Sequence, residues 1–243
     1  MGLRAATVID YPGLGPVELR PLATAVRFTA RRRADRYTLT VPARATAADI
    51  TDALRRMSPR LAALPRPAIH TYPAGYTFSA PGWAATVAAD PAVAAGKLRM
   101  RRATSDTDGS LLYTIAVSPE TLATPAAAPA IAKALCAAAH AYTAAALIPD
   151  ARAIAAGLGA RPSGWSVSRG AGRLGFCTAA GRIALSERVA MLPVELRRYI
   201  ITHELAHLTH FDHSPDFHTL WRRYLGCDPA GLRPILRKFK WPV

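Results

Sequence analysis

Cysteine is scarce in this 243-residue chain: the three cysteines, Cys136, Cys177 and Cys227, are odd in number and far apart. They form neither a CxxC pair nor the spacing of a disulfide framework, which favours a reducing compartment. Residues 1–7 contain none of the apolar core that a secretory signal peptide needs. The sequence therefore predicts a cytoplasmic protein without structural disulfides.

Strongly apolar runs are also missing. The most apolar stretch, residues 122–148, consists mainly of alanine and contains Lys133, Pro125 and Pro129. Alanine contributes little transfer free energy, and a charge near the centre of a bilayer is costly. We therefore expect no membrane-spanning segment and no membrane partner.

Acidic residues are few. There are 16 of them against 31 basic residues, which gives a formal net charge of +15 and a pI near 10.7. Four of the basic residues are lysines and 27 are arginines, and the excess is +7 for residues 1–120 and +8 for residues 121–243, which excludes a basic tail. Such a charge suits an anionic partner such as nucleic acid, but an arginine-rich composition produces it with no partner at all. The charge alone favours the second interpretation.

The amino-terminal part of the chain has the patterns of strands. Residues 26–30 and 37–41 alternate polar and apolar side chains on either side of an arginine-rich turn, which is typical of a hairpin. One helix is expected to begin after the N-cap Thr46 and to end near Pro59. This part of the chain is therefore predicted to be β-rich with one helix.

The character of the sequence changes after Pro125. A long alanine-rich helical stretch is followed by a short strand pair at residues 172–177 and 182–185. With 51% hydrophobic and 19% charged residues, the chain has enough apolar surface to form real cores. We expect an α+β fold with a β-rich region at residues 1–122 and a mainly helical domain at residues 123–243.

The pattern H-E-x-x-H occurs as His203, Glu204 and His207 on a segment with helical periodicity that Pro193 opens. Positions i and i+4 lie about 40° apart around a helix, so the two imidazoles project from one face and can bind a single ion. Glu204 lies beside that ion rather than on it and can act as a general base. Zn²⁺ is the metal that this ligand type favours.

A helix with two solvent-facing histidines is the alternative interpretation. It is weakened because the two histidines share their face with Leu196, Tyr199 and Ile200, which are expected to point inward. Imidazoles buried there without a metal would need other polar partners.

A catalytic zinc site needs a third protein ligand, and His210 and His213 are both near enough in sequence. Ser214 and Pro215 look like the N-cap and first residue of a new helix, over about residues 215–225, so the chain is expected to turn before them. That turn can bring His213 back to the metal, and we favour His213 over His210. Other metallopeptidase classes fit less well, because no methionine follows Met191 and no glutamate follows Glu204.

With these motifs the chain resembles the YgjP-like, WLM-type zinc hydrolases, which are related to SprT-like metallopeptidases. The resemblance is carried by residues 173–177, 181–186, 203–208, 212–217 and 238–242, with Pro193 opening the helix. It implies a zincin-like domain with a short β-hairpin before the H-E-x-x-H helix, and it assigns the third ligand to His213. Leu174, Phe176 and Asp212 replace the tryptophan, serine and asparagine of the family pattern, and none of these changes removes a ligand.

The expected function is that of a zinc-dependent hydrolase of metallopeptidase type, with His203, His207 and His213 as ligands and Glu204 as the base. Arg173 and Tyr199 are candidates for contacts with the substrate or the transition state. The resemblance also leaves open a nucleoside triphosphate pyrophosphatase that acts on UTP at the same site. A third alternative is a SprT-like protease that acts on DNA-bound protein.

Overall fold

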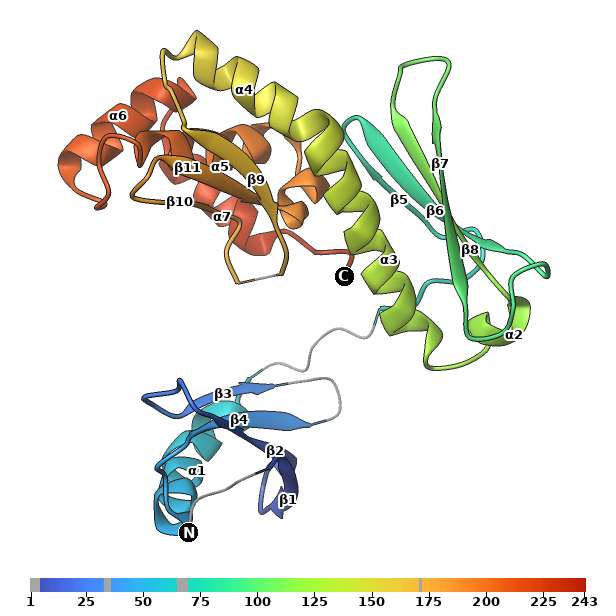
Figure 1. Cartoon of the computed structure of the whole chain (residues 1–243), viewed down its shortest axis with the longest axis vertical. Coiled ribbons are helices and arrows are strands. Elements are labelled where there is room, and N and C mark those ends of the chain that lie inside the picture. Colours follow the sequence, from blue (N-terminus) through green and yellow to red (C-terminus); the bar gives the residue numbers. More distant parts are fainter. Residues whose placement is uncertain (1–4, 33–35, 65–69, 171) are drawn as a thin grey trace. The chain divides into compact units, whose positions relative to one another are not determined.

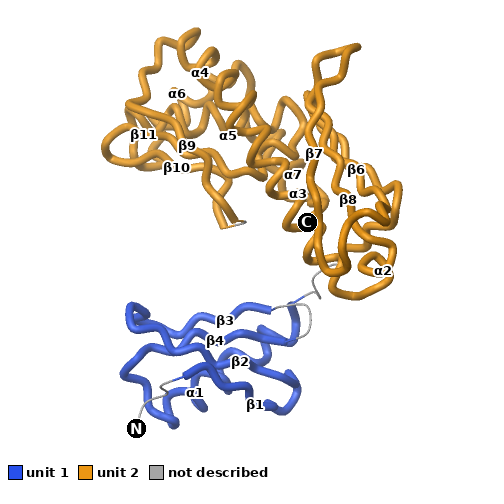
Figure 2. Tube along the Cα trace, turned by 45° about the vertical axis from the view of Figure 1, so that its right-hand side comes forward, with its two compact units in different colours: residues 1–69 blue, residues 70–243 orange. Residues whose placement is uncertain are grey.

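The computed structural model describes residues 5–32, 36–64, 70–170 and 172–243 (Figure 1). The chain divides into two compact units, unit 1 (residues 1–69) and unit 2 (residues 70–243), as Figure 2 shows. Each unit has its own hydrophobic core. Strands form in both units and most of the helices belong to unit 2, so the predicted α+β class is confirmed.

Unit 1 is a four-stranded sheet with a helix on one face. Its strands are β1 (Thr7–Tyr11), β2 (Gly15–Leu22), β3 (Thr29–Arg32) and β4 (Tyr37–Pro42), in the order β1-β2-β4-β3. Alternate side chains such as Val17, Leu19 and Leu39 point towards the helix and are buried. The predicted hairpin is present as the antiparallel pair β3–β4, and part of its turn, residues 33–35, lies outside the described residues.

Helix α1 (Ala47–Ala62) begins at the predicted N-cap. The Thr46 hydroxyl accepts from the Asp49 amide at 3.2 Å, and the Asp49 carboxylate accepts from the Thr46 amide at 2.8 Å, which completes a capping box. The predicted end near Pro59 is wrong, because Pro59 lies inside the last turns. Pro59 has no N–H for the Arg55 carbonyl, and the Ser58 hydroxyl donates to that carbonyl instead, at 3.3 Å.

Unit 2 begins with a second four-stranded sheet, followed by the short helix α2 (Pro119–Leu122). Its strands are β5 (Thr77–Ala80), β6 (Trp83–Ala89), β7 (Leu98–Thr104) and β8 (Leu111–Val117), in the order β5-β6-β8-β7. Trp83, Tyr113 and Ile115 of this sheet pack in the same core as Ile131 and Leu135 of the following helix. The predicted boundary at residue 122 therefore falls inside unit 2, between a sheet and the helix that covers it. The compact units divide instead between residues 69 and 70.

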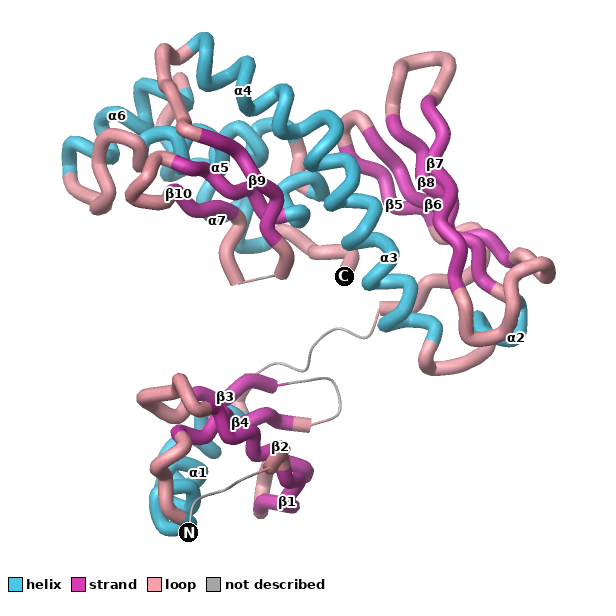
Figure 3. The backbone as a smooth tube through the Cα atoms, in the orientation of Figure 1, coloured by secondary structure: helices cyan, strands magenta, loops and turns pink. Residues whose placement is uncertain are grey.

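That helix is long. It consists of α3 (Ala127–Tyr142), the π-helical turn η1 (Thr143–Leu147) and α4 (Ile148–Gly157), and it runs between the two sheets of unit 2 (Figure 3). By length and composition the run Ala127–Gly157 could cross a membrane, yet 44% of its most apolar window is buried inside the protein. Its buried residues, including Leu135 and Ala151, belong to the core of unit 2.

The second sheet of unit 2 has three strands: β9 (Gly164–Ser168), β10 (Gly175–Cys177) and β11 (Arg182–Ser186), in the order β10-β11-β9. The predicted strand pair is present as β10–β11, which are antiparallel, with Gly181 at φ +73° in the turn between them. β9, which the sequence did not predict, is parallel to β11. β10 therefore forms an outer edge of the sheet.

The remaining elements are mainly helical. They are the 3-10 turn η2 (Glu187–Met191), α5 (Val194–Ala206), α6 (Pro215–Leu225), the 3-10 turn η3 (Pro229–Gly231) and α7 (Leu232–Lys238). Pro193 is the N-cap of α5, one residue before the predicted position. Arg197 is buried on α5 and donates to the carbonyls of Leu192 (2.8 Å) and Ala190 (2.5 Å) and to the Tyr142 hydroxyl (3.2 Å). The bond to Tyr142 connects the start of α5 to the long helix, and the other two connect it to η2 and the residue that follows it.

Candidate metal centre

Three histidines of unit 2 converge at the end of α5. The Nε2 atom of His203 lies 3.2 Å from Nε2 of His207 and 3.3 Å from Nε2 of His213. One potential ligand atom from each residue lies within 4.8 Å of the other two. His203 and His207 are partly buried and His213 is exposed, so the cluster opens to solvent on the His213 side.

The turn between α5 and α6 brings His213 to the other two histidines. α5 ends at Ala206, and Ser214 caps α6 by accepting from the Phe217 amide at 3.4 Å. His213 is thus the residue immediately before the N-cap Ser214, in agreement with the turn that the sequence predicted before this helix. His210 contributes its backbone instead of its ring, because its carbonyl lies 2.9 Å from Nδ1 of His207.

The contact with His210 determines which nitrogen of His207 is available to an ion. A carbonyl can only accept, so Nδ1 of His207 carries the proton and donates. Its Nε2 lone pair then faces the other two imidazoles. This is the arrangement by which proteins orient a metal-binding histidine.

Aromatic rings pack against the cluster from α6. The Phe217 ring centroid lies 4.5 Å from that of His207, and the Trp221 centroid lies 4.6 Å from that of His203. Both aromatic side chains are buried. Burial, followed by the neighbouring histidines, lowers the pKa of His203 to about 3, so this imidazole is neutral at physiological pH and able to bind a cation. The spacing of four residues between Phe217 and Trp221 was the only sequence signal for this packing.

Glu204 lies on the inner side of α5, where 6% of the residue is exposed. Burial raises the pKa of its carboxyl to about 7. The side chain lies directly against Gly175 of β10: a Cβ atom at position 175 would come within 2.7 Å of Cγ and of Oε1 of Glu204. Glycine at position 175 therefore leaves the space that the carboxylate occupies, a role that the sequence did not reveal.

The residues on either side of Gly175, Leu174 and Phe176, are two of the three positions where the chain departs from the family pattern. Leu174 packs against the core of unit 2, and Phe176 is 38% exposed on β10. Burial, and secondarily the charge of Glu204, raises the pKa of the Cys177 thiol. Gly175 and Cys177 are thus the residues of this strand that lie near the Glu204 carboxylate.

The two further candidates from the sequence differ in position. Arg173 is exposed and lies two residues before Gly175, the residue that contacts Glu204. Within the part of the chain that the structure describes, Arg173 makes no ion pair. Tyr199 is buried with its ring 4.8 Å from that of Trp221, and burial raises its pKa. Tyr199 therefore packs behind the cluster, against the Trp221 ring that contacts His203, whereas Arg173 is exposed just before β10.

Comparison with known proteins points to one family. The family model described as YgjP-like, metallopeptidase domain, matches residues 97–227, which is more than half of the chain. The match runs from the start of β7 to just beyond α6 and includes the three histidines and Glu204. No curated protein and no solved structure matches the chain significantly. The chain belongs to the YgjP-like metallopeptidase family.

Proposed function

We propose that the protein is a zinc-dependent hydrolase that cleaves peptide bonds, with His203, His207 and His213 holding Zn²⁺ and Glu204 acting as the general base. The convergence of the three Nε2 atoms supports a metal at this position. Nitrogen ligands about 2.0–2.1 Å from a tetrahedral zinc lie about 3.3 Å from one another. The two shorter separations in the cluster, 3.2 and 3.3 Å, fit that value.

Zinc held by three protein ligands supplies Lewis-acid chemistry and makes water acidic near neutral pH. The protein supplies the base. Glu204 follows His203 on α5, and its raised pKa suits proton uptake and release near pH 7. Glu204 can take a proton from the water that attacks the peptide carbonyl and can then return this proton to the leaving amine.

The observation that carries the peptide assignment is the open edge of β10. This strand pairs with β11 on one side, and no other described strand pairs with its outer side. An extended peptide can add to such an edge through main-chain hydrogen bonds. Gly175 on β10 contacts Glu204, so a peptide bound along this strand would lie beside the base.

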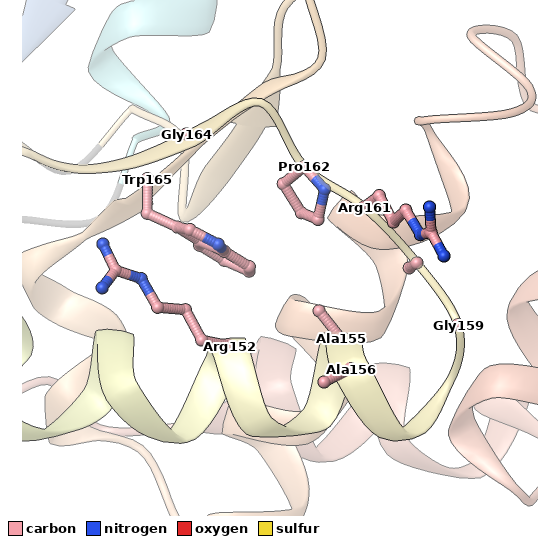
Figure 4. Close-up of a pocket in the computed structure, with 9 residues that line it drawn as sticks. Arg152, Ala155, Ala156, Gly159, Arg161, Pro162, Gly164 and Trp165 are labelled. Carbon is pink, nitrogen blue, oxygen red and sulfur yellow. The ribbon is translucent and has the colours of Figure 1, made fainter.

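An arginine-containing cavity is the feature that would favour a nucleotide. Such a cavity, of about 640 Å³, lies between α4 and β9 and is lined by Arg152, Arg161 and Trp165 (Figure 4). Its lining includes none of the three histidines. β11 separates β9 from β10, which places the two strands about 10 Å apart. The cavity therefore gives no support to UTP as a substrate at the histidine cluster. The other alternative, cleavage of DNA-bound protein, would need a further surface that binds nucleic acid.

Two assays separate the substrate classes. We expect the zinc-loaded protein to cleave an unfolded polypeptide such as carboxymethylated casein, with new amino termini identified by mass spectrometry. We expect no release of pyrophosphate from UTP. Pyrophosphate release that disappears in Glu204→Gln, without peptide cleavage, would replace this proposal with the pyrophosphatase.

Replacing Gly175 with alanine is expected to lower kcat by about 10²-fold, which is a typical cost of displacing a catalytic group by about 1 Å. The new Cβ would overlap the Glu204 side chain. The backbone at position 175 is not in the left-handed region, so alanine brings no backbone strain of that kind. Zinc content should stay unchanged.

Gly172→Ala is the matched control for this change. A Cβ atom at position 172 would meet nothing within 4 Å, and this loop precedes the same strand. Wild-type kcat in Gly175→Ala would show that the contact with Glu204 does not position the base.

A further inference from the structure

The net positive charge per residue is higher in unit 1 than in unit 2. Residues 1–69 carry 12 arginines and 5 acidic residues, a net charge of +7. The remaining 19 basic and 11 acidic residues leave +8 for the 174 residues of unit 2. Charge per residue is therefore about twice as high in unit 1, a difference that counting by sequence halves had concealed.

Part of this charge lies on the face of the unit 1 sheet that is opposite α1. The strand register aligns Arg20 of β2 with Thr40 of β4, and Thr40 with Thr29 of β3. In the neighbouring row of the same face, Thr38 of β4 is aligned with Glu18 of β2 on one side and with Arg31 of β3 on the other. These positions alternate with the inward apolar residues, so arginine and threonine side chains share the outer face with one carboxylate, that of Glu18.

The loop between β2 and β3 turns this face into a hollow. A cavity of about 440 Å³ is lined by Arg20, Arg27 and Arg31, by four threonines, and by Leu22, Ala25 and Val26 of the loop and strand end. Its lining contains no acidic and no aromatic side chain. Guanidinium groups together with hydroxyl groups form the donor set that proteins use for phosphate oxygens.

One carboxylate lies close to the cavity. Glu18 pairs with Arg20 at 2.8 Å, and the two side chains are 17% and 59% exposed. Within the described residues, Arg27 and Arg31 make no ion pair. Two of the three arginines are therefore available to an anion at once, and the third becomes available if the anion displaces Glu18.

We propose that this face of unit 1 binds the phosphate backbone of double-stranded nucleic acid without sequence preference. Proteins that bind single strands stack bases on aromatic side chains, and the cavity has none. Its donors suit phosphates alone, and contacts with phosphates carry no direct sequence information. The surface lies entirely in unit 1 and does not depend on the histidine cluster.

Fluorescence anisotropy of the full-length protein with a labelled 20-base-pair DNA duplex tests the proposal. Three arginines that neutralise three phosphates give a slope of log K against log salt of about −2.7, which is about a 40-fold loss of affinity between 50 and 200 mM KCl. The Arg20→Gln/Arg27→Gln/Arg31→Gln variant should lose most of this slope. An RNA duplex of the same sequence, measured in parallel, shows which nucleic acid is preferred.

A matched control changes the same charge on the other side of the unit. Arg55, Arg56 and Arg60 are exposed on α1, and their replacement by glutamine should leave affinity and slope near wild type. Glu18→Gln should act in the opposite direction, tightening binding several-fold at 50 mM KCl, because it frees Arg20. A purely structural role for these residues would not produce an increase.

Three results would overturn the proposal. They are equal loss of affinity in the two triple variants, no change of slope in the Arg20/Arg27/Arg31 variant, and tighter binding to polyglutamate than to the duplex. Circular dichroism of each variant shows that the sheet is intact. If the triple variant fails to fold, Arg27→Gln alone, in the loop, should reduce the slope by about 0.9.

Discussion

Glu204→Gln is expected to lower kcat for peptide hydrolysis by about 10²–10⁴-fold, the usual contribution of a general base, with zinc content unchanged. Glutamine has nearly the same shape as glutamate, so it fits the space beside Gly175. It cannot accept a proton at neutral pH. The loss should therefore appear in kcat and not in metal binding.

The control for this variant is Glu195→Gln. Glu195 is an exposed glutamate in the first turn of α5, away from the histidines on the same helix, and its replacement should leave kcat near wild type. Elemental analysis and steady-state kinetics on all three proteins make the comparison. A Glu204→Gln enzyme that retains full activity would exclude Glu204 as the base.

His203→Ala is expected to weaken zinc binding by at least about 100-fold. Loss of a residue that only hydrogen-bonds a metal ligand already lowers metal affinity by about 10–100-fold, and His203 is itself a proposed ligand. Nε2 of His203 is the atom that approaches both other imidazoles, so its removal leaves His207 and His213 without their common neighbour. Hydrolysis should be lost together with the metal. Competition with a zinc-binding dye measures the affinity.

His210→Ala separates the two candidates for the third ligand. His210 contacts the cluster through its carbonyl, which alanine also has, so this variant should bind zinc close to the wild-type affinity. His213→Ala should behave like His203→Ala. If His210→Ala lost zinc and His213→Ala kept it, the third ligand would be His210.

The parts of the site that the sequence predicted depend on local signals. H-E-x-x-H specifies one face of one helix, and the Ser214-Pro215 start of α6 requires a turn just before it. Together they were sufficient to prefer His213 over His210, and the structure places the His213 ring in the cluster. Thr46 was likewise recognisable, because capping chemistry involves only a few neighbouring residues.

The features that the sequence did not predict depend on contacts between distant segments. Gly175 meets Glu204 only because β10 lies along α5, and a lone glycine in a strand pattern does not identify its partner. β9 pairs in parallel with β11 across about 18 residues of chain, a pairing with no local turn signal. The boundary near residue 122 followed a change in composition, whereas the fold joins the sheet before it to the helix after it.

The separate cores of the two units have a calorimetric consequence. All buried residues of one core come from the first 69 residues, and all those of the other come from residues 70–243. Heat can disrupt each core cooperatively without disrupting the other, so a single Tm does not describe the full chain. A ligand raises the melting temperature only of the structure that binds it. In a heating scan, zinc should shift the transition of the larger unit, and a DNA duplex should shift that of the smaller one.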